Sequence, residues 1–309
     1  ETGQPTESDS QQTSVVDPKG NGTKENPYLI KTADDLLDFA DRINNPDDDG
    51  EYASSFFRLE NDIDMADEKY VSAVKPVTVE NEDGTTEVKG GFRGSFDGHG
   101  HNISNLTITQ TLRMSVGYVG LFGYTNKANV YDLTLEGVKY VVESISGEST
   151  IGAYIGGAVG YAVLTNFVNV KTSGTVETRL LPKNIAHIGG VAGELEVYDK
   201  EKAYIAYVRN CRAAVETIVG KFDGTEDSVL EVASNGGIVG TVSCTKGAVA
   251  IVNCVSDGKV YGGQFVGGIV GYNSGSNVSI VNCVNYASVR ATAKDVSYAG
   301  GIVGSARND

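Results

Sequence analysis

The pattern of apolar and polar positions predicts one amphipathic helix near the start of the chain and short strands after it. The helix is indicated by apolar residues that recur on one face, namely Leu36, Leu37, Phe39, Ala40 and Ile43. Thr32 precedes the helix as its N-cap, Asp34 and Asp35 occupy the first turn, and Asn44-Asn45-Pro46 ends it. Beyond residue 50, short apolar runs are separated by Gly, Ser and Asn, which is typical of strands joined by turns.

A glycine phrase recurs six times along the remaining chain. It begins as Gly120-Leu121-Phe122-Gly123 and continues as five copies of Gly-Gly-X-X-Gly, which end at Gly160, Gly193, Gly240, Gly271 and Gly304. A second phrase, an Asn or Asp followed by an apolar residue or Cys, keeps step with most copies: Asn105-Leu106, Asp132-Leu133, Asn169-Val170, Asn210-Cys211, Asn253-Cys254 and Asn282-Cys283. Two phrases that keep step predict a stack of structural repeats.

Each repeat holds three short strand-like runs separated by turns. In residues 265–293 these runs are Val266–Tyr272, Val278–Val284 and Ala287–Ala291. Such a unit coils once around a triangular prism, and successive coils pair in parallel with like residues on like. We therefore predict an all-β fold, a parallel β-helix solenoid of short strands, in which the amphipathic helix caps the open end of the stack.

The chain divides into three predicted regions. Residues 1–20 are polar and aperiodic, and we interpret them as a remnant of a secretion vector followed by a flexible leader. Residues 21–90 form an N-terminal cap of strand, helix and hairpin, and residues 91–309 form the β-helix repeats. Because a sixth glycine phrase begins a coil close to the last residue, we expect the chain to be the N-terminal part of a longer protein.

The distribution of charge excludes one class of partner. Residues 1–100 hold 23 acidic and 9 basic residues, whereas residues 101–309 hold 17 and 16. No basic stripe is available to neutralise phosphates, so we expect no binding of nucleic acid. No apolar run approaches the ~18 residues of a membrane-spanning helix, so we expect no membrane insertion within this chain.

Three segments and the glycine phrases together resemble a known family. The segments are Asn26-Pro27-Tyr28-Leu29-Ile30, Leu59-Glu60-Asn61-Asp62-Ile63-Asp64 and Phe92-Arg93-Gly94-Ser95-Phe96-Asp97-Gly98-His99-Gly100-His101. They resemble the opening of bacterial surface proteins with GLUG-type repeats, and the Gly-Gly-X-X-Gly phrases resemble the repeat itself, so the resemblance covers residues 21–309. It implies a right-handed parallel β-helix on an exported bacterial surface protein.

Similar repeats accompany peptidases of the IgA1-protease type. The catalytic domain of those enzymes would need a zinc-binding His-Glu-X-X-His helix. The histidines of this chain are His99, His101 and His187, and none of them belongs to such a motif. The resemblance therefore implies the fold and an extracellular location, and it carries over no activity.

Aromatic residues recur at two positions of the glycine phrase. Tyr124, Tyr161 and Tyr272 follow a closing glycine, whereas four rings lie three residues before the second glycine: Tyr154, His187, Phe265 and Tyr298. Stacked aromatic columns on a flat face can hold a sugar chain or a protein, because tyrosine offers apolar area together with a hydroxyl. The candidate binding residues are Tyr124, Tyr161, Tyr272, Tyr154, Phe265 and Tyr298. The alternative is that these rings only pack a corner of the fold.

Two acidic and histidine-containing segments are candidate metal sites. Asp62, Asp64 and Asp67 can offer carboxylates to calcium, although their spacing is not that of an EF-hand, and a solvated turn is the favoured interpretation. His99 and His101 lie beside Asp97, and we favour a turn there over metal ligation. Apart from this calcium alternative, we expect no cofactor.

The cysteines and asparagines of the second phrase are interpreted as structural. Cys211, Cys254 and Cys283 occupy a column of core residues and are expected to be buried thiols, with a disulfide as the less favoured alternative. Cys244 lies outside that column, and the spacings fit no zinc site. The asparagines, Asn105, Asn169, Asn210, Asn253 and Asn282, are expected to stack as a ladder at a turn.

The repeat region shows no recurring pair of carboxylates such as a polysaccharide-cleaving groove would need. Its acids, among them Glu136, Glu143, Glu148, Glu177, Glu194, Glu196, Asp199 and Glu216, do not recur one coil apart. We therefore expect a non-catalytic adhesin or binding module of a bacterial cell surface, which docks a host protein or glycan such as an immunoglobulin or mucin. The alternatives are a polysaccharide-cleaving β-helix enzyme and a passive spacer for a downstream domain.

Overall fold

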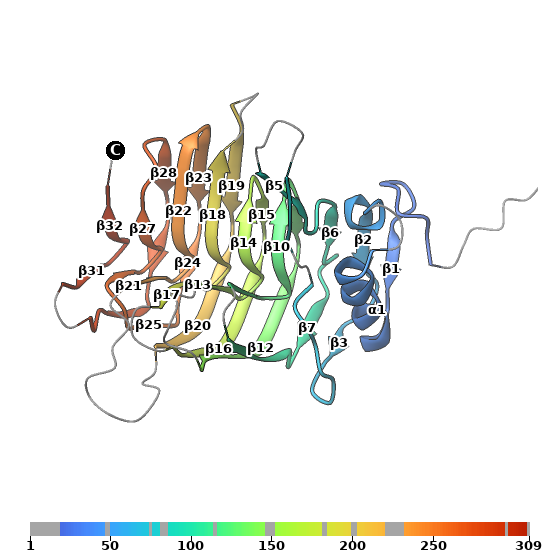
Figure 1. Ribbon diagram of the computed structural model, residues 1–309, viewed down its shortest axis with the longest axis horizontal. Helices are drawn as coiled ribbons and strands as arrows, with labels where there is room; N and C mark the ends of the chain where they lie inside the picture. The colour runs from blue at the N-terminus through green and yellow to red at the C-terminus, as the bar shows by residue number, and fades with distance from the viewer. Residues whose placement is uncertain are drawn as a thin grey trace, which may run out of the picture.

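The computed structural model describes residues 19–46, 50–73, 76–80, 86–113, 116–145, 152–180, 184–198, 203–219, 232–293 and 296–307. The predicted leader, residues 1–20, lies outside these ranges except for its last two residues. In Figure 1 the strands follow one another along the long axis of the molecule, from helix α1 and strand β1 at one end to β31 and β32 at the other.

The described strands form four parallel sheets, each named here after its first strand, and one antiparallel hairpin. The β1 sheet contains β1 (Tyr28–Ile30), β2 (Phe56–Leu59), β6 (Ser95–Asp97), β11 (Asn129–Tyr131), β15 (Asn166–Val168), β19 (Ile205–Arg209), β23 (Ala248–Val252) and β28 (Val278–Val281). The β3 sheet contains β3 (Ile63–Asp64), β7 (Asn102–Ser104), β8 (Thr107–Leu112), β12 (Thr134–Ser144), β16 (Lys171–Arg179), β20 (Arg212–Val219), β24 (Val255–Ser256), β25 (Lys259–Tyr261), β29 (Val284–Asn285) and β30 (Ser288–Arg290).

The other two sheets are built by the glycine phrases. The β9 sheet contains β9 (Gly117–Val119), β13 (Gly152–Gly156), β17 (Ile185–Gly189), β21 (Val232–Gly236), β26 (Phe265–Gly267) and β31 (Tyr298–Gly300). The β10 sheet contains β10 (Phe122–Asn126), β14 (Val159–Val163), β18 (Ala192–Tyr198), β22 (Val239–Lys246), β27 (Val270–Asn273) and β32 (Val303–Ala306). The hairpin is formed by β4 (Pro76–Glu80) and β5 (Thr86–Gly90).

The fold is a parallel β-helix, as the repeats predict. Successive coils pair in register with like residues on like. Phe122, Val159 and Ala192, for example, are partners in neighbouring strands of the β10 sheet, and all three are fully buried. The buried side chains of the coils thereby form one continuous apolar core.

The predicted count of three strands per repeat is wrong, because the coils from β6 onward contribute strands to four sheets. Residues 266–272, expected as one strand, divide at Gly267-Gly268 into β26 and β27, which belong to different sheets. Two adjacent glycines let the chain bend sharply where side chains would collide. The glycine phrase is therefore a corner between two short strands.

Helix α1 (Ala33–Asn44) covers one end of the stack, which confirms the predicted capping helix. Its first turn is closed by reciprocal bonds: the Asp35 amide donates to Thr32 Oγ1 at 3.2 Å, and the Thr32 amide donates to the Asp35 carboxylate at 3.1 Å. Phe39, on its apolar face, packs at 4.8–5.9 Å between ring centroids against four core rings: Phe57, Phe92, Phe96 and Phe122. A 3-10 turn, η1 (Tyr52–Ser54), follows the helix.

A ladder of asparagines holds one corner of the coils. The side-chain amide of Asn169 donates to Asp132, that of Asn210 to Asn169 at 3.1 Å, and that of Asn253 to Asn210 at 3.2 Å. These residues have φ between 52° and 56°, a left-handed conformation that Asn and Asp tolerate better than most side chains. The ladder prediction is confirmed for Asn169, Asn210 and Asn253.

Asn105 is not part of this ladder, contrary to the prediction. It follows strand β7 of the β3 sheet and donates to Asp64 at 2.8 Å, whereas the ladder residues follow strands of the β1 sheet. Its φ of 59° shows that it makes the same local turn at a different corner. Leu106 therefore lies outside the column of core residues that Leu133 begins.

The column after the asparagines is apolar, as predicted. Leu133 and Val170 are fully buried, Cys211 and Cys254 are at most 1% exposed, and Cys283 is partly exposed. All four cysteines of the chain are free thiols. Hydrogen bonding with Cys211 and burial raise the pKa of the Cys254 thiol to about 12, so this sulfur stays protonated at neutral pH.

Candidate functional site: two columns of aromatic side chains

Two columns of side chains run along the β9 and β10 sheets. Parallel pairing places the equivalent residue of each coil in register. The first column, on the β9 sheet, consists of Tyr118, Tyr154, His187, Ser234, Phe265 and Tyr298. The second column, on the β10 sheet, consists of Tyr124, Tyr161, Glu194, Thr241, Tyr272 and Ser305.

The closing glycine of each phrase brings the two columns together. A Cβ atom at Gly160 would lie 2.7 Å from the backbone nitrogen of Val119 and 2.8 Å from the carbonyl oxygen of Tyr154. A Cβ atom would likewise lie 2.5–2.7 Å from a backbone nitrogen of the β9 sheet at four later closing glycines: Gly193, Gly240, Gly271 and Gly304. Because no side chain fits there, the backbones of the two sheets meet and the columns lie side by side.

The first three coils of the columns form an interlocked group, here called the Tyr–Glu cluster: Tyr118, Tyr124, Tyr154, Tyr161, His187, Glu194 and Glu196. Within the first column, the ring of Tyr154 is stacked on Tyr118 at 5.5 Å and on His187 at 5.0 Å. Within the second column, Tyr124 and Tyr161 are stacked at 5.7 Å. Tyr154 also meets Tyr161 edge-to-face at 4.7 Å, so neighbouring rings fix one another in both directions.

Two carboxylates complete the Tyr–Glu cluster. Glu194 and Glu196 are two residues apart on β18, so they lie on the same face of that strand. The Tyr161 hydroxyl donates to Glu196 Oε2 at 2.7 Å, and Ser243 Oγ donates to Glu194 Oε1 at 2.8 Å. Burial, and then the charges of Glu194 and Glu196, raise the pKa of Tyr161, so its hydroxyl remains a donor.

Burial disfavours charge on both Glu194 and its neighbour His187. Glu194 is 8% exposed, and burial together with the charge of Glu196 raises its pKa to about 7 in spite of the bond from Ser243. Burial lowers the pKa of His187 to about 4. Its Nδ1 atom lies 3.7 Å from Glu194 Oε2 and also contacts the Thr241 hydroxyl. Between these two pKa values both groups are neutral, so their contact is not an ion pair.

The last two coils carry a smaller group, here called the Phe265 cluster, which consists of Phe265, Tyr272 and Tyr298. The ring of Phe265 is stacked on Tyr272 at 4.8 Å and on Tyr298 at 5.7 Å. Tyr298 is 48% exposed, and the other two rings are partly exposed. Ser234 and Thr241 occupy the two column positions between the clusters, so the aromatic face is interrupted there.

The structure therefore places the six predicted binding residues in two groups. Tyr154 and Tyr161 are partly exposed in the Tyr–Glu cluster, whereas Tyr124 is only 5% exposed. Glu194 and Glu196 were not predicted to lie on this face, because they are paired with tyrosine and valine one coil away rather than with other acids. A usable signal was present: Glu194 follows its closing glycine as Tyr161 follows Gly160.

The acidic segment proposed for calcium has other partners. Asp62 accepts from the Asn102 amide at 3.0 Å and contacts His101 Nδ1 at 3.1 Å, and these bonds lower its pKa. Asp64 accepts from Asn105 and from the Ala66 amide. Within the described ranges, no three His, Cys, Asp or Glu side chains gather as metal ligands would, Asp67 included.

Comparison with known proteins gives partial matches. No protein-family model matches the chain. It is 32% identical over 178 residues to "Halomucin" of Haloquadratum walsbyi, which covers 58% of this chain and 2% of that protein. It is also 32% identical over 148 residues to a "Putative Gly-rich membrane protein" of Evansella cellulosilytica, over 48% of this chain and 15% of that protein. The chain thus spans a small part of either relative.

One solved structure resembles the chain weakly. It is titled a "putative immunoglobulin A1 protease from Bacteroides ovatus", and the match covers 95% of this chain and 87% of that chain at 19% identity. Its TM-score of 0.43 is too low to support an argument about this chain. In the part of the chain that the structure describes, no helix is both long enough and apolar enough to span a bilayer.

Proposed function

We propose that the chain is a non-catalytic binding module of a bacterial surface protein, which holds a host protein or glycan against the two aromatic columns. The observation that carries this proposal is the fixed position of partly exposed rings such as Tyr154 and Tyr161. Each of these rings is held by its neighbours along and across the columns. A ligand would therefore meet aromatic area whose side chains lose little conformational entropy on binding.

The chemistry of the face suits ligands that combine apolar patches with hydroxyl or amide groups. Tyrosine presents apolar area and a polar tip, and such rings are common at the centres of protein interfaces. The matched stretches of "Halomucin" and of the "Putative Gly-rich membrane protein" support an extracellular or surface location for this module. The near-neutral charge of residues 101–309 leaves both proteins and glycans as ligand classes.

The experiment is a binding screen of the purified chain against arrayed human secreted and cell-surface proteins, with a glycan array in parallel. The expected result is a saturable hit that weakens when Tyr154 is replaced by Ala in a folded variant. A hit that tolerates this change and also Tyr298→Ala would refute binding through the columns. Clean negatives on both arrays would instead support a passive spacer.

Glu194 and Glu196 motivate a second candidate function, cleavage of a polysaccharide on the same face. A carboxyl group whose pKa is raised to about 7 can donate a proton near neutral pH, as glycoside hydrolysis requires of its general acid. The test is incubation of the chain with neutral and acidic polysaccharides, followed by measurement of reducing ends and of unsaturated products. Turnover that Glu194→Gln abolishes would establish an enzyme, and no turnover across the panel would exclude this candidate.

A further inference from the structure

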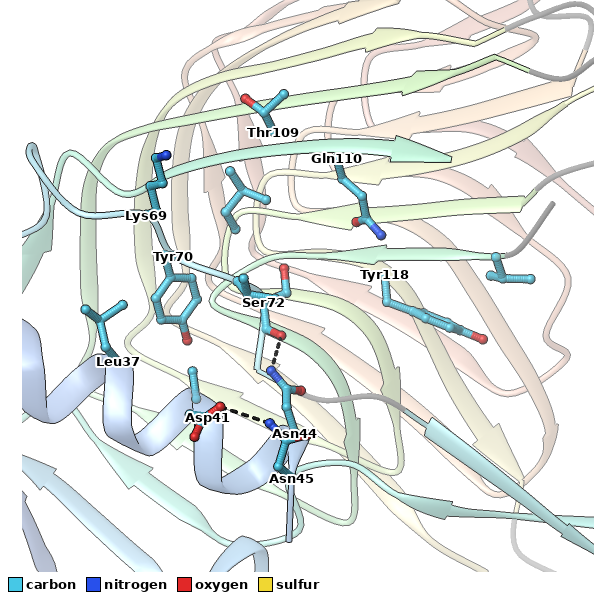
Figure 2. A pocket seen from close by; sticks show the side chains of 14 residues that line it. Leu37, Asp41, Asn44, Asn45, Lys69, Tyr70, Ser72, Thr109, Gln110 and Tyr118 are labelled. Carbon is cyan, nitrogen blue, oxygen red and sulfur yellow. Dashed lines mark hydrogen bonds between the residues drawn. The ribbon is translucent and has the colours of Figure 1, made fainter. Parts of the chain in front are cut away.

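A pocket of about 860 Å³ lies between helix α1 and the β-helix, beside the first ring of the aromatic columns (Figure 2). Its lining includes Leu37, Asn44, Ser72, Gln110, Val116 and Tyr118. This volume falls within the ~300–1,000 Å³ of ordinary small-molecule sites. The pocket is built by three separate parts of the chain: α1, residues 69–72, and the strands β8 and β9 with their surroundings.

Tyr118 presents an uncovered side to this pocket. Strand β9 is the edge strand of its sheet, so Tyr118 is the first residue of its column. Tyr154 covers one face of the ring, with only 12° between the two ring planes, and Tyr124 and Tyr161 meet Tyr118 edge-to-face. Among the described residues no second ring is stacked on Tyr118, and the same side chain lines the pocket. A ring bound there would extend the column by one step.

The walls of the pocket differ in polarity. Leu37, Ile108 and Val116 supply apolar surface, and Val116 is 45% exposed. Asn44 lies on another wall, where its side-chain amide donates to the Ser72 carbonyl at 3.1 Å. The Gln110 side chain has no hydrogen bond to the described part of the chain. Amide and hydroxyl groups beside an aromatic face match the needs of a pyranose ring, which has both C–H faces and hydroxyls.

The electrostatics of the cap disfavour anions. Helix α1 carries Asp34, Asp35, Asp38 and Asp41 against one cation, Arg42, and the pocket lies at its C-terminal end, where the helix dipole is negative. Lys69 and Asp41 are the charged residues of the lining, so the lining carries no net charge. A carboxylated sugar, such as a sialic or uronic acid, would therefore meet a repulsive field.

We propose that this pocket binds a neutral pyranose unit of a glycan, stacked on Tyr118. The inference rests on the proposed function, since it names the ligand class for the end of the same aromatic columns. It adds a distinct site whose polar groups come from the cap and from strand β8, and it predicts selectivity against anionic sugars.

The test is saturation-transfer NMR and calorimetry of the whole chain with defined probes. N-acetyllactosamine, mannotriose and cellotriose serve as neutral probes, and sialyllactose and trigalacturonate as anionic ones. We expect saturable binding of at least one neutral probe, weakened about tenfold by Tyr118→Ala, which corresponds to ~1.4 kcal/mol. Val116→Trp, at an exposed position, should weaken binding by filling the pocket without disturbing the core. Tyr298→Ala, in the same column at the far end, is the matched control and should bind as the wild type does.

Three results would overturn this inference. They are the absence of saturable binding for every neutral probe, tighter binding of an anionic probe, and full binding by a folded Val116→Trp variant. If a ligand from the arrays bound the wild type and Val116→Trp but did not bind Tyr154→Ala, the proposed function would stand and the pocket assignment would fail. If no ligand bound on any array, both would fail.

Discussion

The Tyr–Glu cluster and the Phe265 cluster occupy the same two columns but differ in how their rings are held. In the Tyr–Glu cluster, stacked rings are cross-braced between the columns, and Glu196 accepts from the Tyr161 hydroxyl. In the Phe265 cluster the rings are stacked, no hydrogen bond joins them to a carboxylate within the described ranges, and Tyr298, in the last described coil, is 48% exposed. Register therefore places each ring, and the residues around it decide how much of that ring is buried.

The glycines of the phrase show the same contrast. A Cβ at Gly190 would lie 2.2 Å from the Gly237 carbonyl oxygen and 2.4 Å from the Ala213 Cβ. Gly301 holds the equivalent position of the last phrase, and a Cβ there would meet nothing within 4 Å. The atoms that exclude a side chain at Gly190 belong to the following coil, whereas Gly301 lies in the last described coil.

The largest expected effect on stability tests the contrast between Gly190 and Gly301. Gly190→Ala should lower the free energy of unfolding by about 3 kcal/mol, because the new methyl group collides with backbone and must displace a packed coil. Gly301→Ala should change it by no more than about 0.5 kcal/mol. Thermal and urea unfolding followed by circular dichroism would measure both variants. Equal losses of stability in the two variants would show that the close approach of neighbouring coils does not determine the cost of adding a methyl group at this position.

A smaller effect is expected when one tyrosine is removed from each cluster. Tyr161→Ala should lose about 2 kcal/mol of stability, because it removes ring contacts and leaves Glu196 without its donor. Tyr272→Ala, at the same column position, should lose about 1 kcal/mol, because fewer contacts disappear. The same unfolding measurements apply, and Tyr161→Phe separates the hydroxyl from the ring. A larger loss of stability for Tyr272→Ala than for Tyr161→Ala would contradict the view that the Tyr–Glu cluster contributes more to stability than the Phe265 cluster.

The third prediction concerns pH and is specific to the Tyr–Glu cluster. Because folding raises the pKa of Glu194 from 4.5 to about 7, the stability it contributes is present below the lower value and is lost as pH rises through the upper one. Because folding lowers the pKa of His187 from 6.5 to about 4, its contribution is lost as pH falls across that interval. The two effects oppose each other in mildly acidic solution.

Glu194→Gln isolates the first effect. Relative to the wild type, this variant should gain about 1 kcal/mol of stability between about pH 6.5 and about pH 8, since its amide cannot ionise. Glu216→Gln, at a partly exposed residue that contacts Lys259, is the control for the same replacement outside the cluster. Parallel pH profiles for the wild type and Glu194→Gln would show that Glu194 is not protonated in the folded state.

The sequence predicted the elements whose signals are local or periodic. Thr32 and the apolar face of α1 are local signals, and the glycine phrase fixes the register in which Tyr124 meets Tyr161. The ladder of Asn169, Asn210 and Asn253 follows from a left-handed turn that recurs at one offset. These features depend on neighbouring residues or on repetition, so the sequence alone defines them.

The remaining features depend on contacts between distant segments. Asn105 makes the same left-handed turn as the ladder residues, so its sequence could not show that it belongs to another corner. Glu194 was missed because its closest partners, His187 and Ser243, come from different strands. The pocket beside Tyr118 arises only where α1 packs against the coils, and no motif marks it.

The most direct test of the central claim is the dissociation constant of the ligand found on the arrays, measured for the wild type, Tyr154→Ala and Tyr298→Ala. Each variant would first be checked for folding by its unfolding midpoint. We expect at least one replacement to weaken binding about tenfold, because we propose that the rings form the contact surface. Unchanged affinity in both folded variants would contradict it and would leave the aromatic columns as corner packing.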